Sequence, residues 1–191
     1  HGGDDPANTP YNSVSSIANN SWIYVAGVRN SDGDTYTWYI NNAETASGTY
    51  NSSYPNIQNQ TFTIGDSYLQ NLNGKLDEFR VSGTPREAGW IKTEYNNQNN
   101  PGIGAGKFIK TLGGEESSPD CGYTYKRTLT IDGDQVGGSS GYLDDFPVLV
   151  ELSGDWLKNT PDGSIQHPTG WDIIFKAEDS TTCDGLSPCT L

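Results

Sequence analysis

Apolar and polar residues alternate with a period of two over two stretches near the start of the chain, residues 22–28 and 35–40. Successive side chains of a β-strand point to opposite faces, so each stretch predicts a strand. Tyr36, Trp38 and Ile40 fall on one face of the second strand. The turn-forming run Asn-Ser-Asp-Gly-Asp at 30–34 joins them, which predicts an antiparallel hairpin with a face to bury.

Similar short patterns recur along the chain, separated by clusters of Asn, Gly, Ser and Pro. We predict further strands at residues 43–50, 61–64, 75–81, 123–131, 146–152 and 171–176. A single helix is predicted from Thr84 to about Asn97, because Thr84, Pro85 and Glu87 fit a capping box with proline at the first helical position. The predicted fold class is all-β, with one short helix.

A stretch rich in glycine and proline, residues 101–120, divides this pattern in two. We interpret it as a linker between a first module over 1–100 and a second over 121–191. Each is expected to be a β-sandwich of jelly-roll type, with the helix at the C-terminal end of the first.

The charge of the chain excludes some partners. The 24 acidic residues exceed the 11 basic ones and give a formal net charge of −13, so the protein repels phosphate backbones and anionic membranes. No apolar run approaches the roughly 20 residues of a membrane span. The start at His1-Gly2-Gly3 does not resemble a signal peptide, and we interpret the chain as a segment of a longer protein.

The motifs of the first module resemble laminin-G-like, concanavalin-A-like domains over residues 15–98. The resemblance is carried by residues 22–28, 36–42, 62–66, 74–82 and the helix with its motif at 90–97. It implies the closing half of such a sandwich, with the N-terminal strands missing. A longer chain, or strand exchange between copies, would complete the sandwich, because an uncovered sheet face and free strand edges favour pairing.

Residues 121–191 resemble an uncharacterised bacterial secreted β-module that occurs beside laminin-G-like domains. The residues that carry this resemblance are 125–131, 143–150 and 170–175. It implies a second β-sandwich, truncated at its C-terminal end.

The residues needed for hydrolysis are missing from the sequence. A glycosidase needs two carboxylates facing one substrate, whereas the adjacent Asp77 and Glu78 point to opposite faces of a strand. The chain has two histidines, His1 and His167, and no Gly-x-Ser-x-Gly motif. We therefore expect no enzymatic activity.

Three kinds of site are predicted, each beside a simpler structural interpretation. Calcium is the candidate cofactor, since hard cations prefer clustered oxygens, although the same loops are explained as plain turns. Aromatic side chains in polar loops could stack on sugars or simply pack, and two nearby cysteines could form a disulfide or stay free. The candidate residues are Asp32, Asp34 and Asp66 for metal, Tyr50, Tyr54 and Tyr68 for ligand, and Cys183 with Cys189 for the disulfide, which leaves Cys121 with an open partner.

From these observations we expect a secreted, non-catalytic structural or adhesive module of a bacterial cell-surface or filament-forming protein. Its expected partners are other copies or neighbouring domains of the same protein. The alternative is a calcium-assisted carbohydrate-binding module, with glycans as partners.

Overall fold

The computed structural model describes residues 20–32, 34–49, 73–117, 125–138, 143, 146–167, 169–171 and 173–175, and every structural statement below concerns these residues. The chain divides into two compact units, His1–Leu149 and Val150–Leu191. In the described residues the regular structure is mostly strand, with one α-helix and two short 3-10 turns, which confirms the predicted fold class.

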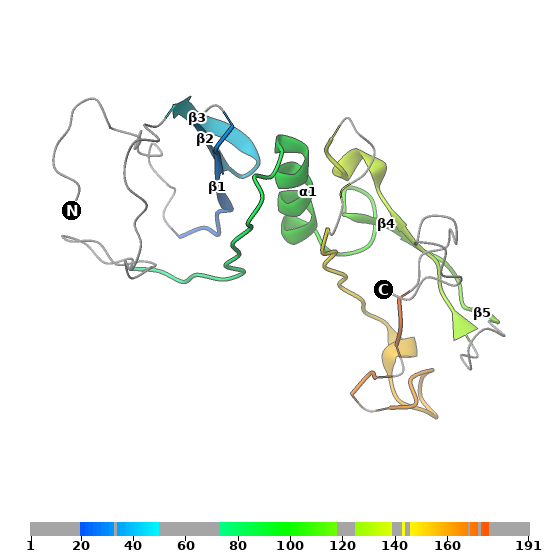
Figure 1. Ribbon diagram of the computed structural model, residues 1–191. Coiled ribbons are helices and arrows are strands. Elements are labelled where there is room, and N and C mark those ends of the chain that lie inside the picture. The colour runs from blue at the N-terminus through cyan, green and yellow to red at the C-terminus, as the bar shows by residue number, and fades with distance from the viewer. Residues whose placement is uncertain are drawn as a thin grey trace. The chain divides into compact units, whose positions relative to one another are not determined.

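The first unit begins with a three-stranded antiparallel sheet of order β1-β2-β3 (Figure 1). Its strands are β1 (Val25–Asn30), β2 (Thr35–Ile40) and β3 (Ala43–Thr49). The predicted bounds of β2 are confirmed, while β1 starts three residues later than predicted. Asn41 and Asn42 both have positive φ, 46° and 66°, as the two-residue turn between β2 and β3 requires.

Large aromatic side chains of β2 lie over glycines of the neighbouring strands. Gly27 of β1 pairs with Trp38, and a Cβ atom at Gly27 would lie 2.7 Å from the Trp38 ring. On β3, Gly48 pairs with Tyr36, and a Cβ atom at Gly48 would lie 2.8 Å from the Tyr36 hydroxyl oxygen. The glycines therefore make room for the aromatic rings. Tyr39 points to the opposite face and is buried.

The predicted helix is confirmed as α1 (Ala88–Asn99), but its predicted start is wrong. The N-cap is Glu87, in an extended conformation and without a side-chain capping hydrogen bond. Thr84 lies outside the helix because its backbone is held in a turn: its N–H donates to Ser82 Oγ, and that hydroxyl donates to the Thr84 carbonyl oxygen, at 3.3 and 2.9 Å.

The other described strands of the first unit form short antiparallel pairs. Strand β4 (Ile109–Leu112) pairs with β7 (Leu129–Ile131), and β5 (Glu116–Ser117) pairs with β6 (Tyr125–Lys126), followed by the 3-10 turn η1 (Gly133–Gln135). The strand predicted over 123–131 is thus interrupted between β6 and β7.

The predicted linker contains two of the most deeply buried apolar side chains among the described residues. Phe108 and Ile109 are each 1% exposed. The compact units divide after Leu149, at a different place from the linker. The division into 1–100, 101–120 and 121–191 stays a prediction about domains, but Phe108 and Ile109 of the predicted linker belong to the buried core of the described residues.

Three predicted strands are corrected in their described residues. Residues 75–81 form no ladder, because Glu78 has a left-handed backbone (φ 51°) and its N–H donates to Asp77 Oδ1. Residues 146–152 form none either, since a side chain of α1 takes both backbone groups of Leu149. Residues 171 and 173–175 form none, because Trp171 lies within a turn in which the Ile173 N–H donates to the carbonyl oxygen of Gly170, whose φ is 71°. The strand predicted at 61–64 lies outside the described residues.

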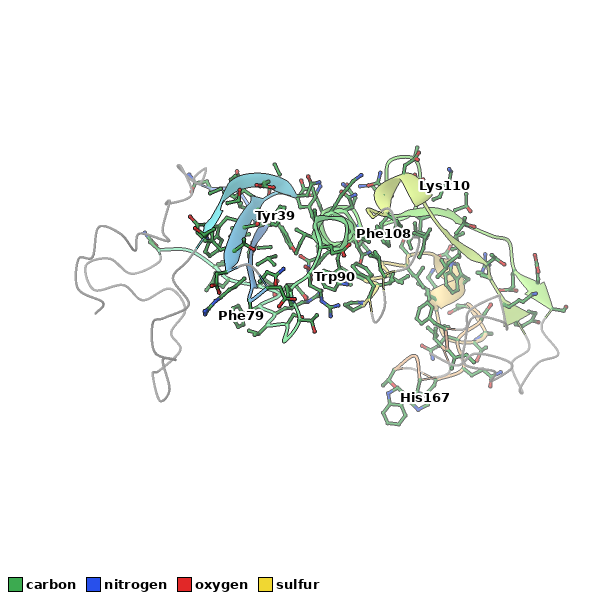
Figure 2. The ribbon with its side chains drawn as sticks, turned by 45° about the horizontal axis from the view of Figure 1, so that its top comes forward. Tyr39, Phe79, Trp90, Phe108, Lys110 and His167 are labelled. Carbon is green, nitrogen blue, oxygen red and sulfur yellow. The ribbon has the colours of Figure 1, made fainter. Side chains whose placement is uncertain are left out.

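The second unit, in its described part, is a set of turns around Ile165. The 3-10 turn η2 (Asp155–Leu157) begins it, and the backbone N–H of Ile165 donates to the carbonyl oxygen of Lys158 at 3.2 Å. A Cβ atom at Gly163 would lie 2.2 Å from that carbonyl oxygen, so this turn requires glycine. His167, labelled in Figure 2, stacks on the exposed Trp171 with ring centroids 5.4 Å apart.

Candidate functional site

The first candidate site is a charged cluster beside α1, which we call the Glu94 cluster: Tyr24, Glu78, Arg80 and Glu94. Arg80 Nη1 donates to Glu94 Oε1 at 2.7 Å, and Arg80 Nη2 donates to Glu78 Oε2 at 2.8 Å. The other oxygen of Glu94, Oε2, accepts a hydrogen bond from the Tyr24 hydroxyl. Each carboxylate oxygen of Glu94 therefore has its own donor.

Burial gives this cluster its electrostatic character. The Glu94 side chain is 9% exposed and that of Arg80 is 39% exposed. Burial is the largest cause that raises the pKa of Tyr24 well above its ordinary value, followed by its hydrogen bond to Glu94 and the charge of that carboxylate. Tyr24 therefore stays a neutral donor far into the alkaline range.

The Glu94 cluster connects residues 24, 78 and 80 with α1 and does not resemble a pair of catalytic carboxylates. Glu78 and Glu94 are both bound by the one guanidinium of Arg80, whereas a glycosidase holds one carboxylate as acid and another as nucleophile or base. Asp77 Oδ1 accepts the Glu78 N–H within the same loop. No sequence signal distinguished Glu94, because a buried glutamate and a solvated one look alike in a helical motif.

Large exposed apolar side chains flank this cluster, and we call them the exposed apolar set. They come from two stretches, 22–25 and 76–81, which the bonds of Tyr24 and Arg80 to Glu94 tie to the same helix. Val81 is 80% exposed and Trp22 is 69% exposed; Phe79 is labelled in Figure 2. The members are Trp22, Val25, Leu76, Phe79 and Val81.

The turn predicted to bind calcium is a compact β-turn between β1 and β2. The Asp32 N–H donates to Asn30 Oδ1 at 2.8 Å, and Asp34 has a positive φ of 52°. In the part of the chain that the structure describes, no group of three or more His, Cys, Asp or Glu could hold a metal ion. Since calcium also takes amide and carbonyl oxygens, a site at Asp32 and Asp34 stays a prediction.

The remaining predicted site residues lie outside the described residues: Asp66, Tyr50, Tyr54, Tyr68, Cys121, Cys183 and Cys189. Their roles in metal binding, ligand binding and disulfide formation also stay predictions. Among the described helices, none is both long and apolar enough to cross a bilayer.

Residues 1–92 match the family model of the concanavalin A-like lectin/glucanases superfamily, a laminin-G model. The N-terminal part of the chain is laminin-G-like. The resemblance predicted over 15–98 is thereby confirmed for this part, and the match ends inside α1. The second resemblance, over 121–191, stays a prediction. No curated protein matches the chain significantly.

One solved structure is also similar, the 2.1 Å crystal structure of an S-layer domain-containing protein (residues 221–444) from Clostridium thermocellum ATCC 27405. The identity is 27% and the TM-score is 0.38. The similarity covers 42% of this chain and 42% of that chain, so it spans less than half the length of the solved chain.

Proposed function

We propose that this chain is a non-catalytic structural and adhesive segment of a bacterial extracellular, cell-surface or filament-forming protein. The segment binds further copies of itself through the exposed apolar set. The laminin-G-like character of residues 1–92 supports the extracellular class. The observation that carries the contact function is the exposure of five large apolar side chains on two stretches tied to α1.

A second copy fits this surface for two physical reasons. Large apolar side chains grouped on a surface mark interaction sites. Among the described strands, β1 and β3 are the edges of the sheet, and edge strands favour pairing with another chain. The charged side chains of the Glu94 cluster, next to the exposed apolar set, each have an ion-pair partner, with one guanidinium bound to two carboxylates. A contact there therefore does not bury Arg80, Glu78 or Glu94 without an ion-pair partner.

Light scattering after size-exclusion chromatography tests this proposal on the full chain, with and without calcium. We expect a mass above the 20.7 kDa of one chain that rises with concentration. Val81→Ser should weaken association about tenfold or more, because burying a valine contributes about 1.5–3 kcal/mol. The control is Val136→Ser, at an exposed valine beside η1. A monomer at every concentration, or equal effects of the two variants, contradicts the proposal.

Calcium-assisted carbohydrate binding is the second candidate function. The description of the matched superfamily includes lectins, and the turn at Asp32 presents an exposed carboxylate between β1 and β2. A glycan array read with and without a chelator tests it. We expect binding that is lost on chelation and in Asp32→Asn but kept in Asp155→Asn, a control at an exposed aspartate of η2. An array without binding in either condition excludes this function.

A further inference from the structure

Helix α1 is buried mainly through polar side chains, unlike an ordinary surface helix that buries an apolar stripe. Its buried residues are Ile91, Thr93, Glu94, Asn96 and Asn97. Buried polar groups are costly unless they are hydrogen-bonded. The hydrogen-bond partners of these four polar side chains therefore show which segments the helix connects.

One side of the helix binds the laminin-G-like part. Glu94 takes hydrogen bonds from Tyr24, directly before β1, and from Arg80. Tyr95 packs edge-on against Tyr24, with ring centroids 5.9 Å apart. In Figure 2, where α1 is seen end on, Tyr39 of the sheet lies on one side of the helix and Phe108 on the other.

The other side binds backbone groups of residues 135–149. Asn97 Nδ2 donates to the Leu149 carbonyl oxygen at 2.8 Å, and the Leu149 N–H donates to Asn97 Oδ1 at 2.6 Å. Asn96 Nδ2 donates to the Gln135 carbonyl oxygen at 2.7 Å. Thr93 Oγ1 accepts the Gly137 N–H at 2.8 Å. These side chains thus pair with backbone groups that a neighbouring strand would otherwise pair with.

Close packing reinforces this second contact. Gly89 lies one helical turn before Thr93, and a Cβ atom there would lie 2.5 Å from the Gly138 backbone. Trp90 packs edge-on against Phe146 at 5.1 Å, and Phe146 stacks near Phe108 at 6.5 Å. The contact thus combines hydrogen bonds, two glycines at close approach and an aromatic cluster.

We propose that α1 is a rigid joint between the laminin-G-like part and the residues that follow it, so that the described residues between 20 and 149 open as one cooperative unit. The match to the laminin-G model ends within this helix, and the buried polar side chains of the helix are hydrogen-bonded on both sides. A substitution that destabilises one side of the helix should therefore also increase local opening on the other side. This inference is independent of the proposed function.

Hydrogen exchange of the full chain, followed by mass spectrometry in low denaturant, tests the joint. The readouts are peptides covering β1 and β2 on one side and β4 and β7 on the other. We expect Asn97→Ala to speed exchange about tenfold or more in both groups, because it removes a buried side chain and both hydrogen bonds that this side chain makes with the Leu149 backbone. Arg80→Gln, on the opposite side of the helix, should also speed hydrogen exchange in both groups of peptides.

Asn99→Ala is the matched control, with the same chemical change at an exposed position of the same helix, and it should leave both groups unchanged. If Asn97→Ala does not fold, Thr93→Val removes one hydroxyl and is expected to have the same two-sided effect. Faster exchange on the mutated side alone, or on neither side, overturns the proposal.

Discussion

At the scale of single residues, Glu94 shows how a buried charge is accommodated. Removing a carboxylate from water is costly unless its oxygens are satisfied. In this protein, Arg80 and Tyr24 each satisfy one oxygen. Arg80 remains partly exposed, so solvent screening reduces what its ion pair contributes. The neutral hydroxyl of Tyr24 is the more protected of the two partners.

The raised pKa of Tyr24 predicts a loss of stability in alkali. Above the ordinary tyrosine value of 10.0, the unfolded chain loses this proton while the folded chain keeps it. The free energy of unfolding therefore falls with pH by up to about 1.4 kcal/mol per unit, starting near pH 10. Tyr24→Phe should be less stable than the wild type at pH 7 by about 1 kcal/mol, and this difference should shrink above pH 10.

Denaturant unfolding of both proteins at pH 7 to 11 measures this difference. Burial also raises the pKa of Tyr39, but Tyr39 is present in both proteins, so its contribution cancels. Tyr125→Phe, at an exposed ring, is the control and should keep the same difference from the wild type throughout. A difference that stays constant above pH 10 for Tyr24→Phe contradicts the prediction.

At the scale of elements, the sheet and the helix are stabilised in different ways. The sheet follows from its own pattern: alternation gives the strands, Asn41 and Asn42 give the turn, and glycines admit the aromatic rings of β2. The helix depends on its neighbours, because its buried side chains are mostly polar and their partners lie far away in sequence.

Gly89→Ala is therefore expected to destabilise the protein although it improves helix propensity. Alanine is favoured over glycine in a helix by about 1 kcal/mol, but its Cβ would lie 2.5 Å from backbone atoms of Gly138, which cannot move aside like a side chain. We expect a net loss of about 1–3 kcal/mol in the free energy of unfolding.

Chemical denaturation measures the change in the free energy of unfolding for Gly89→Ala, with Gly83→Ala as the control. A Cβ atom at Gly83 would meet nothing within 4 Å, so this control should be neutral or slightly stabilising, by up to about 1 kcal/mol. A stabilising Gly89→Ala would mean that α1 does not approach residues 137 and 138 as closely as described.

At the scale of the whole molecule, charge opposes the proposed association. A net charge of −13 makes copies repel each other, and salt screens this repulsion beyond about 8 Å at physiological ionic strength. The light-scattering experiment therefore belongs at physiological salt or above, where apolar contacts decide the outcome. At low salt, repulsion alone could keep the chains apart.

Much of the local structure was predictable from the sequence. The bounds of β2, the hairpin before it, the existence of the helix, and the mostly-β class were all predicted from periodicity and turn residues. These features depend on interactions between residues that are close in the chain. The laminin-G-like resemblance was predictable as well, because it is carried by an ordered series of such local motifs.

Periodicity by itself determined which residues can form strands, but only the tertiary structure decided which of them do. Residues 75–81 and 146–152 have strand patterns, yet a left-handed Glu78 and the Asn97 side chain take the backbone groups that a ladder would use. Likewise, Phe108 and Ile109 lie in a stretch that resembles a linker, and they are buried because distant segments cover them. A strand needs a neighbouring strand for its hydrogen bonds, and an apolar side chain needs other segments to bury it. Both are supplied by residues far away in sequence, which a local pattern does not identify.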